Sequence, residues 1–565
     1  MSIDKIETTV LIVGAGPTGL TAGILLSRLG IDHRIVERRS GPQRAPAAHA
    51  VNARTFEIWR QAGVDMDAIF AAAKHPRDAG SVYWVTRLGG EILGRLPYER
   101  QGDEVLEVTP TPLRNLSQHR LEPILLDSLT RAEKPPHYLQ QWESSEQSDA
   151  RVVSQVREIE TGKVLEIHSR YLIAADGAGS PVRKSVGIQP IGPDRIQGFM
   201  MIHFEANLRS IVADCPGVLY WVSDPSCSGT FVAHDIDREW VFMHAWDPDS
   251  ESIENYDFQR CERIVRRAIA TDDVKLTIRT VGPWMMTSQV AERYRAGRIF
   301  LAGDSAHRFP PTGGLGLNTG VQDAHNLVWK IAAVEEGWAG PELFDTYEQE
   351  RQPTARYNAE QSFQNAVRLL EVPQAMGTND TPERARENFA AMLADPARRS
   401  EVSAAINNQA EHFDMLGLQL GYSYEAGAVA SDGTEEKRPA NPVRELIPSG
   451  RPGSRLPHAW VGVDQCRIST LDLVESDGLT LIIGRNGSTW MSAAQRLRLP
   501  IRTLQIGKEI DDPTDWWTQV VEMKSDGALL VRPDQHIAYR SKSAAAKPSA
   551  ALREVCSAIL RLSLD

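Results

Sequence analysis

Cysteine is scarce in this sequence, which has five cysteines in 565 residues. They stand far apart and form no CxxC pair, at Cys215, Cys227, Cys261, Cys466 and Cys556. A disulfide framework, a cysteine zinc site and a dithiol redox centre all need paired or clustered cysteines, so the pattern argues against each of them. A reducing, cytoplasmic location fits these scattered thiols best.

Long apolar runs are also missing. The longest, such as residues 9–13 and 479–483, fall far short of the roughly 18 to 20 residues that span a bilayer. The opening MSIDKIETTV mixes charges and leads directly into a strand pattern, unlike a secretory signal or a transit peptide. We therefore expect a soluble protein with no membrane partner.

The charge pattern lacks a long basic stripe, and 62 basic against 74 acidic residues give a net charge of -12. Nucleic acid is therefore not an expected partner. A chain of this length is expected to form roughly two to four domains, with room for a large cofactor. The sequence leaves the oligomeric state open, a homo-oligomer included.

A glycine pattern stands at a strand-to-helix junction near the start of the chain. Residues 9–13 are apolar and β-branched, and apolar residues then recur at helical spacing. Gly14, Gly16 and Gly19 form GxGxxG between them, and the following strand ends in the acid Glu37. Bare backbone at a helix N-terminus accommodates a pyrophosphate, and an acid roughly 20 residues further on binds ribose hydroxyls. The segment predicts dinucleotide binding.

Two later segments follow strands in the same way. DGAGSPVR, residues 176–183, is interpreted from its residues alone as a strand end and a helix cap, with Ser180 capping. GDSAHRFPPTGGLGLNTG, residues 303–320, contains a strand ending in Asp304, a glycine-rich loop and a helix beginning near Leu317. Asp304 with His307 suggests a metal, but further ligands are missing nearby, so we expect none.

The 303–320 segment instead suits an organic ligand. A carboxylate at a strand end fits a sugar or ribityl hydroxyl. The bare loop 313–316 and the helix start at Leu317 and Asn318 suit a flat ligand that gains negative charge, because a helix N-terminus carries partial positive charge.

The remaining chain predicts further domains. Helical patterns also cover residues 55–62, ending at Gly63, and about 118–132. Short alternating runs from residue 151 onward indicate antiparallel strands, and the stretches 321–334 and 381–410 are again helical in pattern. Five prolines between residues 428 and 460 favour a linker, followed by a small α/β module. We expect the first part of a nucleotide-binding domain at residues 1–185 and a β-rich substrate domain at 186–290. The nucleotide-binding domain then resumes, with a helical segment, at 291–427. A linker at 428–452 leads to a C-terminal domain at 453–565.

GAGPTGL, DGAGSPVR and GRIFLAGDSAHRFPPTGGLGLNTGVQDAHNLVWKIA together resemble the class A flavin monooxygenases, the para-hydroxybenzoate hydroxylase superfamily. The resemblance leans toward its phenol and aromatic polyketide hydroxylases with an added C-terminal domain. It implies an α/β fold in which a Rossmann-like (GR2-type) FAD-binding domain is interrupted by a mixed or antiparallel β-sheet substrate domain. It also implies a C-terminal thioredoxin-like domain, which cannot perform thiol chemistry here without CxxC.

The resemblance also assigns cofactor contacts. The first glycine loop and the acid after it would hold the ADP half of FAD, the DGAGSPVR acid would serve both FAD and NAD(P)H, and the 303–320 segment would bind the ribityl chain and the flavin ring. The residues implied are Gly14, Gly16, Pro17, Thr18, Gly19, Glu37, Arg38, Gln118, Asp176, Asp304, Pro311, Gly316, Leu317 and Asn318.

The implied reaction is hydroxylation of a phenolic or other electron-rich ring by O2 through a flavin C4a-hydroperoxide, with NADPH or NADH as reductant. A phenol reacts better once deprotonated, and His49 in AAHAVNARTFEI matches the family histidine that could serve as base. Two positions depart from the family pattern: Ala47 replaces an arginine, and Asn115 replaces an aspartate and cannot act as a base.

Other interpretations remain open. The same oxidant could perform epoxidation or Baeyer-Villiger oxidation of an aromatic polyketide, or the chain could be an FAD-bearing protein that binds an aromatic compound without turnover. The aromatic and histidine side chains on the predicted strands could contact substrate, although such residues more often pack in the core. These are Tyr220, Trp221, His234, His244 and Trp246.

Overall fold

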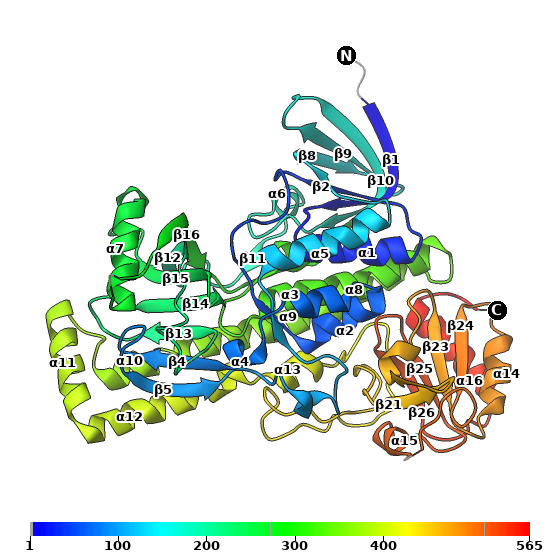
Figure 1. The fold of residues 1–565 in the computed structure, drawn as a ribbon. Coiled ribbons are helices and arrows are strands. Elements are labelled where there is room, and N and C mark those ends of the chain that lie inside the picture. The colour runs from blue at the N-terminus through cyan, green and yellow to red at the C-terminus, as the bar shows by residue number, and fades with distance from the viewer. Residues whose placement is uncertain (1–3, 272, 514, 565) are drawn as a thin grey trace.

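The computed structural model describes residues 4–271, 273–513 and 515–564 (Figure 1). Its largest sheet has eight strands around a parallel core. β1 (Asp4–Val13) pairs in parallel with β2 (His33–Glu37) and β10 (Val164–Ala174), and its last four residues are fully buried, as expected for a central parallel strand. The other strands are β7 (His137–Tyr138), β8 (Gln140–Gln147), β9 (Val152–Glu158), β18 (Arg295–Ala296) and β19 (Ile299–Leu301).

Helices α1 (Pro17–Arg28), α5 (Gln118–Arg131) and α8 (Leu315–Glu335) pack beside this sheet, with α1 in contact with both others (Figure 1). The helix predicted to end at Gly63 is α2 (Ala53–Ala62), closed by that glycine at φ 77°. α8 begins slightly before the predicted start at Leu317, because Gly314 at φ 62° forms its N-cap. Neighbouring helices are α3 (Met66–Ala72), α4 (Pro76–Ala79), α6 (Pro181–Ser185) and α9 (Asp345–Arg368).

A second sheet has seven strands in the order β16-β12-β15-β14-β13-β4-β5. It is mixed, because β13 pairs with β4 in parallel while the other pairs are antiparallel. β4 and β5 precede residue 100, so the sheet draws on residues outside the 186–290 segment expected to form it. The strands are β4 (Ser81–Val85), β5 (Ile92–Pro97), β12 (Gln197–Glu205), β13 (Leu219–Val222), β14 (Gly229–Asp235), β15 (Glu239–Trp246) and β16 (Thr277–Met286).

Helices cover both faces of the second sheet (Figure 1). α7 (Phe258–Ile269) shares a buried apolar cluster with one face, and α10–α12 share another with the opposite face. The latter helices are α10 (Glu371–Met376), α11 (Pro382–Ala394) and α12 (Pro396–Asn407). Short pairs lie near the first sheet: β3 (Ala50–Val51) with β6 (Arg114–Asn115), and β17 (Gln289–Ala291) with β11 (Pro190–Ile191) and β20 (His307–Arg308).

The C-terminal part contains a four-stranded sheet in the order β24-β23-β25-β26. Its apolar core joins Trp329 and Trp338 from the end of α8 and the turn after it. The elements are α13 (Leu416–Leu420), β21 (Trp460–Val463), β22 (Cys466–Ser469), β23 (Leu479–Ile483), α14 (Ser488–Gln495), β24 (Ile501–Gln505), α15 (Trp516–Val520), β25 (Ala528–Val531), β26 (Ile537–Ser541) and α16 (Pro548–Leu560). Within the described residues, none of the helices is both long enough and apolar enough to cross a bilayer.

Candidate cofactor and substrate site

The three glycines of the first loop have different surroundings. A Cβ on Gly14, at φ 106°, would lie 2.2 Å from the Ala175 carbonyl oxygen, and one on Gly19 would lie 2.0 Å from the carbonyl oxygen of Gly14. These two glycines let α1, β1 and β10 approach closely. Gly16 has no protein atom within 4 Å of its Cβ position, and Pro17 occupies the first turn of α1. The backbone at Gly16 therefore remains open to a ligand, as in a dinucleotide-binding loop.

The acid at the end of β2 is held by backbone donors. Glu37 accepts hydrogen bonds from the backbone N–H groups of Ala15 at 2.8 Å and Arg39 at 2.9 Å. Burial by itself raises the pKa of Glu37, but these bonds and the Arg39 charge hold it below its ordinary value. Arg39 also approaches Glu37 through its side chain, whereas the predicted Arg38 is exposed. Arg39 lies in the bend that follows β2, outside the strand repeat, so no periodic pattern in the sequence identified it.

Gln118 belongs to the same side of the sheet. Its Nε2 donates to Glu122 Oε1 at 2.7 Å, and Glu122 Oε2 accepts from the Gln43 backbone at 2.6 Å. Arg39 Nη1 lies 3.6 Å from Glu122, which links this group to Glu37. The structure thus connects the two predicted residues Glu37 and Gln118 through Arg39 and Glu122.

Thr18 packs the start of α1 against the 303–320 segment. A Cβ on Gly303 would lie 2.6 Å from Thr18 Oγ1, and one on Gly320 would lie 2.3 Å from the same atom. Both glycines are therefore needed for α1 and α8 to approach each other. The glycine loop and the 303–320 segment therefore lie directly against each other.

Asp304 lies within this region. Its carboxylate can be reached by solvent. The protein packed around it nevertheless raises the pKa of Asp304, against the lowering effect of the His307 and Arg308 charges. Among the described residues, its carboxylate has no hydrogen-bonding or ion-pair partner. An acid so placed fits a ligand that brings its own hydroxyl groups.

His307 has a structural role. Its Nε2 lies 2.7 Å from Asp323 Oδ2, and Asp323 also accepts from Arg351 Nε at 2.8 Å and from the Gly303 backbone at 3.1 Å. The His307 ring stacks on Phe309 with centroids 4.8 Å apart. In the part of the chain that the structure describes, no group of three or more His, Cys, Asp or Glu side chains is arranged to hold a metal.

The start of α8 combines open backbone with a fixed side chain. Gly316 has no protein atom within 4 Å of its Cβ position, Leu317 is half-buried and Pro311 in the preceding loop is exposed. The N–H groups of the first helical turn have no acceptor inside the helix, which makes this end electropositive. At this loop it is backbone, rather than side chains, that is available to a ligand.

The Asn318 side chain is held by four hydrogen bonds within the protein. Its Oδ1 accepts from the Asn52 backbone at 2.9 Å and Thr55 Oγ1 at 2.8 Å. Its Nδ2 donates to the carbonyl oxygens of Ala50 at 2.9 Å and Gly314 at 2.7 Å. The amide is fully used in tying α8 to β3 and α2, so only its backbone is left for a cofactor.

The DGAGSPVR segment forms the predicted helix cap. Ser180 Oγ accepts from the Arg183 backbone at 2.9 Å and donates to Asp176 Oδ1 at 2.6 Å. Asp176 also accepts from the Val182 backbone at 3.1 Å. Arg183 donates to the Ser305 carbonyl at 2.8 Å, which brings this segment against the 303–320 segment.

His49 lies beside the glycine-rich loop. The next residue, Ala50, is so close to Gly314 that a Cβ on that glycine would lie 2.7 Å from the Ala50 Cβ. His49 Nδ1 is 2.9 Å from Asn115 Oδ1, and its ring meets that of His234 edge-on at 5.6 Å. Burial lowers the pKa of His49 to about 4; the Asn115 hydrogen bond opposes this, and the Lys74 charge adds to it.

One face of the seven-stranded sheet carries half-buried side chains toward this histidine. The strand register aligns Met201, Met243, Thr230 and Trp221 across β12, β15, β14 and β13. Ala50 shares an apolar cluster with this face. Of the other candidate side chains, Tyr220 and Trp246 pack with the opposite, α7-covered face, and the His244 ring stacks on Phe242 of that cluster.

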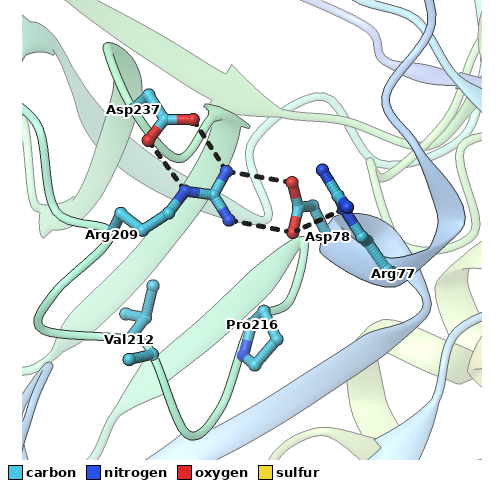
Figure 2. A pocket seen from close by; sticks show the side chains of 7 residues that line it. Arg77, Asp78, Arg209, Val212, Pro216 and Asp237 are labelled. Atoms are coloured by element: carbon cyan, nitrogen blue, oxygen red, sulfur yellow. Dashed lines mark hydrogen bonds and ion pairs between the residues drawn. The ribbon is translucent and has the colours of Figure 1, made fainter.

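A separate surface cavity of about 550 Å³ lies beside α4, which contributes Arg77 and Asp78 to its lining (Figure 2). Arg209 bridges Asp78, at 3.0 and 3.1 Å, and Asp237, at 2.7 Å to each oxygen. Its charge is therefore balanced by two carboxylates, which pin α4 to the loops of the sheet. The cavity is lined by Arg77, Asp78, Arg209, Val212, Ala213, Pro216 and Asp237 and is apart from the glycine loops.

The fold and these loops together define a nucleotide-binding α/β flavoprotein, because open backbone at Gly16 and Gly316, an anchored acid at Glu37 and an unpaired acid at Asp304 all fit FAD. Comparison with known proteins agrees. Residues 7–362 match the FAD binding domain family and residues 449–560 match the family described as aromatic-ring hydroxylase, C-terminal. The chain belongs to the FAD-dependent aromatic-ring hydroxylases, monooxygenases that use NAD(P)H as co-substrate.

Similar proteins cover almost the whole chain. Tetracenomycin B2 monooxygenase-dioxygenase of Streptomyces olivaceus is 33% identical, over 99% of both chains. Phenol 2-monooxygenase of Pseudomonas sp. (strain EST1001) is 32% identical, over 98% of this chain and 93% of its own. The crystal structure of the flavin-dependent monooxygenase PieE in complex with FAD and substrate superposes with a TM-score of 0.92 at 34% identity, over 99% of this chain and 100% of that one.

Proposed function

We propose that this protein hydroxylates a phenolic, polycyclic aromatic compound held between the 313–318 loop and the Met201 to Trp221 row of the seven-stranded sheet. The row crosses four strands, and at about 4.8 Å between strands it is about 14 Å wide. Such a half-buried, apolar surface suits a flat fused-ring system better than a single ring. Relatives named for tetracenomycin B2 and aklavinone, as well as for phenol, support this class.

The proposed architecture follows the sequence expectation. A Rossmann-like FAD-binding domain would comprise residues 1–185 and 291–427, with a substrate domain at 186–290 that borrows β4 and β5. Residues 428–452 would be the linker and 453–565 a thioredoxin-like domain. The parallel β19-β10-β1-β2-β7 core and the β23-β24 parallel pair support these assignments.

Bound FAD supplies the oxygen-activating chemistry, and the chain supplies position and charge. The ADP half would lie along Gly14 to Gly19 with its ribose at Glu37, and Asp304 would bind the ribityl chain. The positive end of α8 would stabilise an anionic reduced ring at Gly316 and Leu317. Asp176 with Arg183 would guide NADPH or NADH, and the apolar row on the seven-stranded sheet would exclude water from the bound ring.

The observation that carries the proposal is the placement of His49. It adjoins the Gly314 turn through Ala50, and its Nδ1 is held by Asn115, which leaves Nε2 for a substrate hydroxyl. A neutral imidazole there can accept the phenolic proton and make the ring a better nucleophile.

The test is a screen of the purified holoenzyme with phenol, 2,4-dichlorophenol and 1,8-dihydroxyanthraquinone. NAD(P)H consumption, peroxide release and product mass under labelled O2 are measured together. We expect stimulated, coupled oxidation with one labelled oxygen added to the ring of the largest compound. Insertion of oxygen into a carbon–carbon bond would indicate a Baeyer-Villiger oxidation, and addition of oxygen across a double bond would indicate an epoxidation. A protein that binds these compounds but shows no stimulation would be a binder, not a hydroxylase.

The His49→Ala variant checks the proposed base. We expect it to retain FAD and to lose hydroxylation by about 100-fold or more, the usual contribution of a general base. His137→Ala removes an exposed histidine of β7 and should have no effect. Unchanged turnover in His49→Ala would remove His49 from the reaction.

A further inference from the structure

We propose that Gln101 is a positioning residue for His49: acting through Asn115, it determines which ring nitrogen of His49 carries the proton. The proposal rests on the role of His49 as base given above. It explains how an amide can occupy the place where relatives of this chain were expected to have an acid.

The orientation of the Gln101 amide is set by backbone. Its Nε2 donates to the carbonyl oxygens of Ala79 at 3.0 Å and Tyr98 at 2.8 Å, and the side chain is buried. A reversed amide would direct its oxygen at two carbonyl oxygens, which repel it. Nε2 is therefore fixed toward the two carbonyls, and Oε1 must point the other way.

The fixed Gln101 oxygen in turn orients the amide of Asn115. Its Nδ2 lies 3.5 Å from Gln101 Oε1, and its Oδ1 lies 2.9 Å from His49 Nδ1. The 3.5 Å contact is long and contributes little attraction. The reversed amide would instead place Oδ1 at 3.5 Å from Oε1, where the two partial negative charges repel each other, so that orientation is disfavoured. Pairing of β3 with β6 holds Ala50 opposite Asn115 and so fixes the distance to His49.

The Asn115 oxygen can only accept, so His49 must carry its proton on Nδ1. A neutral imidazole has one N–H, and its lone pair is then on Nε2. In the reaction, the phenolic O–H bond breaks, a new N–H bond forms at Nε2, and the electron pair stays on the substrate oxygen. The resulting imidazolium still donates from Nδ1 to Asn115. The proton returns to solvent or product when the ring is released.

The tautomer of His49 matters because the charge of its ring does not change over the working pH range. Burial lowers the pKa of His49 to about 4, with Lys74 adding to the effect, so the ring is neutral across pH 5 to 8. The adjoining His234 also has a strongly lowered pKa through burial, and its Nδ1 is buried without a partner in the described chain. Neither Lys74 nor His234 determines which ring nitrogen of His49 carries the proton; the hydrogen bond from Nδ1 to Asn115 does.

The first test removes the orienting amide. With the panel compound that gives the highest turnover, Gln101→Leu should lower kcat for hydroxylation by about tenfold, at every pH from 5 to 8, with the Kd for FAD unchanged. The matched control is Gln352→Leu. Gln352 is also buried and donates from Nε2 to two carbonyl oxygens, of Ala291 and Glu292 at 2.8 Å, but these bonds join α9 to the end of β17 and not to Asn115 or His49. It should keep wild-type turnover.

The second test is a rescue. A carboxylate has two equivalent accepting oxygens and needs no orientation, so Asn115→Asp should restore turnover in the Gln101→Leu background. Its charge should also raise the pKa of His49, so that an acidic limb appears in the pH profile of kcat/KM. A purely structural role for Gln101 predicts no rescue, because the aspartate does not replace the lost bonds to Ala79 and Tyr98.

The Tm of the Gln101→Leu holoenzyme, measured together with its turnover, guards against a folding failure: a Tm close to that of wild type shows that lost turnover does not come from unfolding. Wild-type turnover in Gln101→Leu while His49→Ala is inactive would overturn the relay and leave the proposed function intact. An unrescued double variant would overturn it as well. Full activity in His49→Ala would instead refute the base itself, and a holoenzyme inactive across the panel would refute the proposed function.

Discussion

At the scale of single residues, Glu99 shows how a side chain outside the site can act on it. Glu99 accepts hydrogen bonds from the Met415 backbone at 3.1 Å and from Gln419 at 3.0 Å. Met415 in turn contacts the Gly313 turn, where a Cβ would lie 3.0 Å from the methionine methyl. Burial and the nearby Asp414 raise the pKa of Glu99 to about 7, against the bonds from Met415 and Gln419 and the charge of Arg100.

This raised pKa makes stability depend on pH. The folded pKa is above the ordinary value of about 4.5, so the folded state binds the proton more tightly. The stabilisation is full below pH 4.5 and is lost as pH rises through 7. Glu99→Gln, which keeps the accepting oxygen without the charge, should therefore raise Tm at pH 8 and leave it nearly unchanged at pH 5.

Thermal unfolding of the holoenzyme at the two pH values measures this effect. Glu160→Gln, at an exposed turn between β9 and β10, is the matched control and should change Tm at neither pH. A Glu99→Gln variant with equal Tm shifts at pH 5 and pH 8 would mean that the Glu99 charge is not the cause.

The residues of the site differ in how far sequence alone could find them. Glu37 and Gly16 belong to one local motif, and Ser180 follows its strand by only a few residues, so their neighbours along the chain identified them. Asn115 was seen only as a departure, because its bond to His49 joins positions 66 residues apart. Gln101 gave no sequence signal, since its task depends on two backbone carbonyls placed by the fold.

At the scale of elements, the junction of β1 with α1 separates the needs of packing from those of binding. Gly14 and Gly19 have protein backbone at their Cβ positions, and Gly16 has none. The start of α1 is thus closely packed against protein at Gly14 and Gly19 and is open to a ligand at Gly16. A single methyl group can therefore disturb either packing or binding, depending on which glycine receives it.

We expect Gly16→Ala to fold normally and to bind FAD at least tenfold more weakly, because its methyl group occupies only ligand space. Gly19→Ala should instead destabilise the apoprotein, since its Cβ would overlap the Gly14 carbonyl oxygen at 2.0 Å. Tm of the apoproteins and fluorescence titration with FAD separate the two effects. Equal FAD affinity in Gly16→Ala and wild type would show that the pyrophosphate does not lie at this loop.

Local patterns predicted elements better than they predicted sheets. The helix ending at Gly63 and the helix starting at Gln118 were found as expected, because caps and apolar spacing are local properties. The membership of β4 and β5 in the seven-stranded sheet was missed. It depends on the parallel pairing of β4 with β13, which are more than 100 residues apart in the chain. The hydrophobic pattern of either segment gives no sign of its partner strand.

At the scale of the whole molecule, a buried ionic cluster joins the C-terminal part to the nucleotide-binding part. Arg532, just after β25, donates to Glu350 of α9 at 2.7 and 2.8 Å and also pairs with Asp534. Lys330 and Asn326 of α8 donate to the same Glu350 carboxylate, at 2.8 and 2.6 Å. The charged side chains are fully buried, so each is stable only while its partners are present.

The cluster makes the C-terminal part a component of the enzyme and not an appendage, although it lacks redox cysteines. Asp534 also accepts from Asn326, which lies on α8, the helix that begins after the glycine-rich 313–314 turn. A second link, from Arg455 to Glu57 of α2 at 2.8 Å, is connected to the cluster through Arg54, which donates to Glu57 at 3.0 Å and to the Asp534 carbonyl oxygen at 2.8 Å. Removal of one cation should therefore loosen the interface as a whole.

We expect Arg532→Met to destabilise the protein by about 3 to 5 kcal/mol, because two buried carboxylates lose their main cation. The segment 428–452 should become sensitive to protease as the C-terminal part undocks, and FAD should be held less tightly. Arg485→Met, which breaks an exposed pair with Asp515 in the same part of the chain, should change stability by no more than about 0.5 kcal/mol. Denaturant unfolding and timed proteolysis of the holoenzymes make the comparison. Equal stability of the two variants would show that hydrophobic contacts at Trp329 and Trp338, and not the ionic cluster, hold the C-terminal part in place.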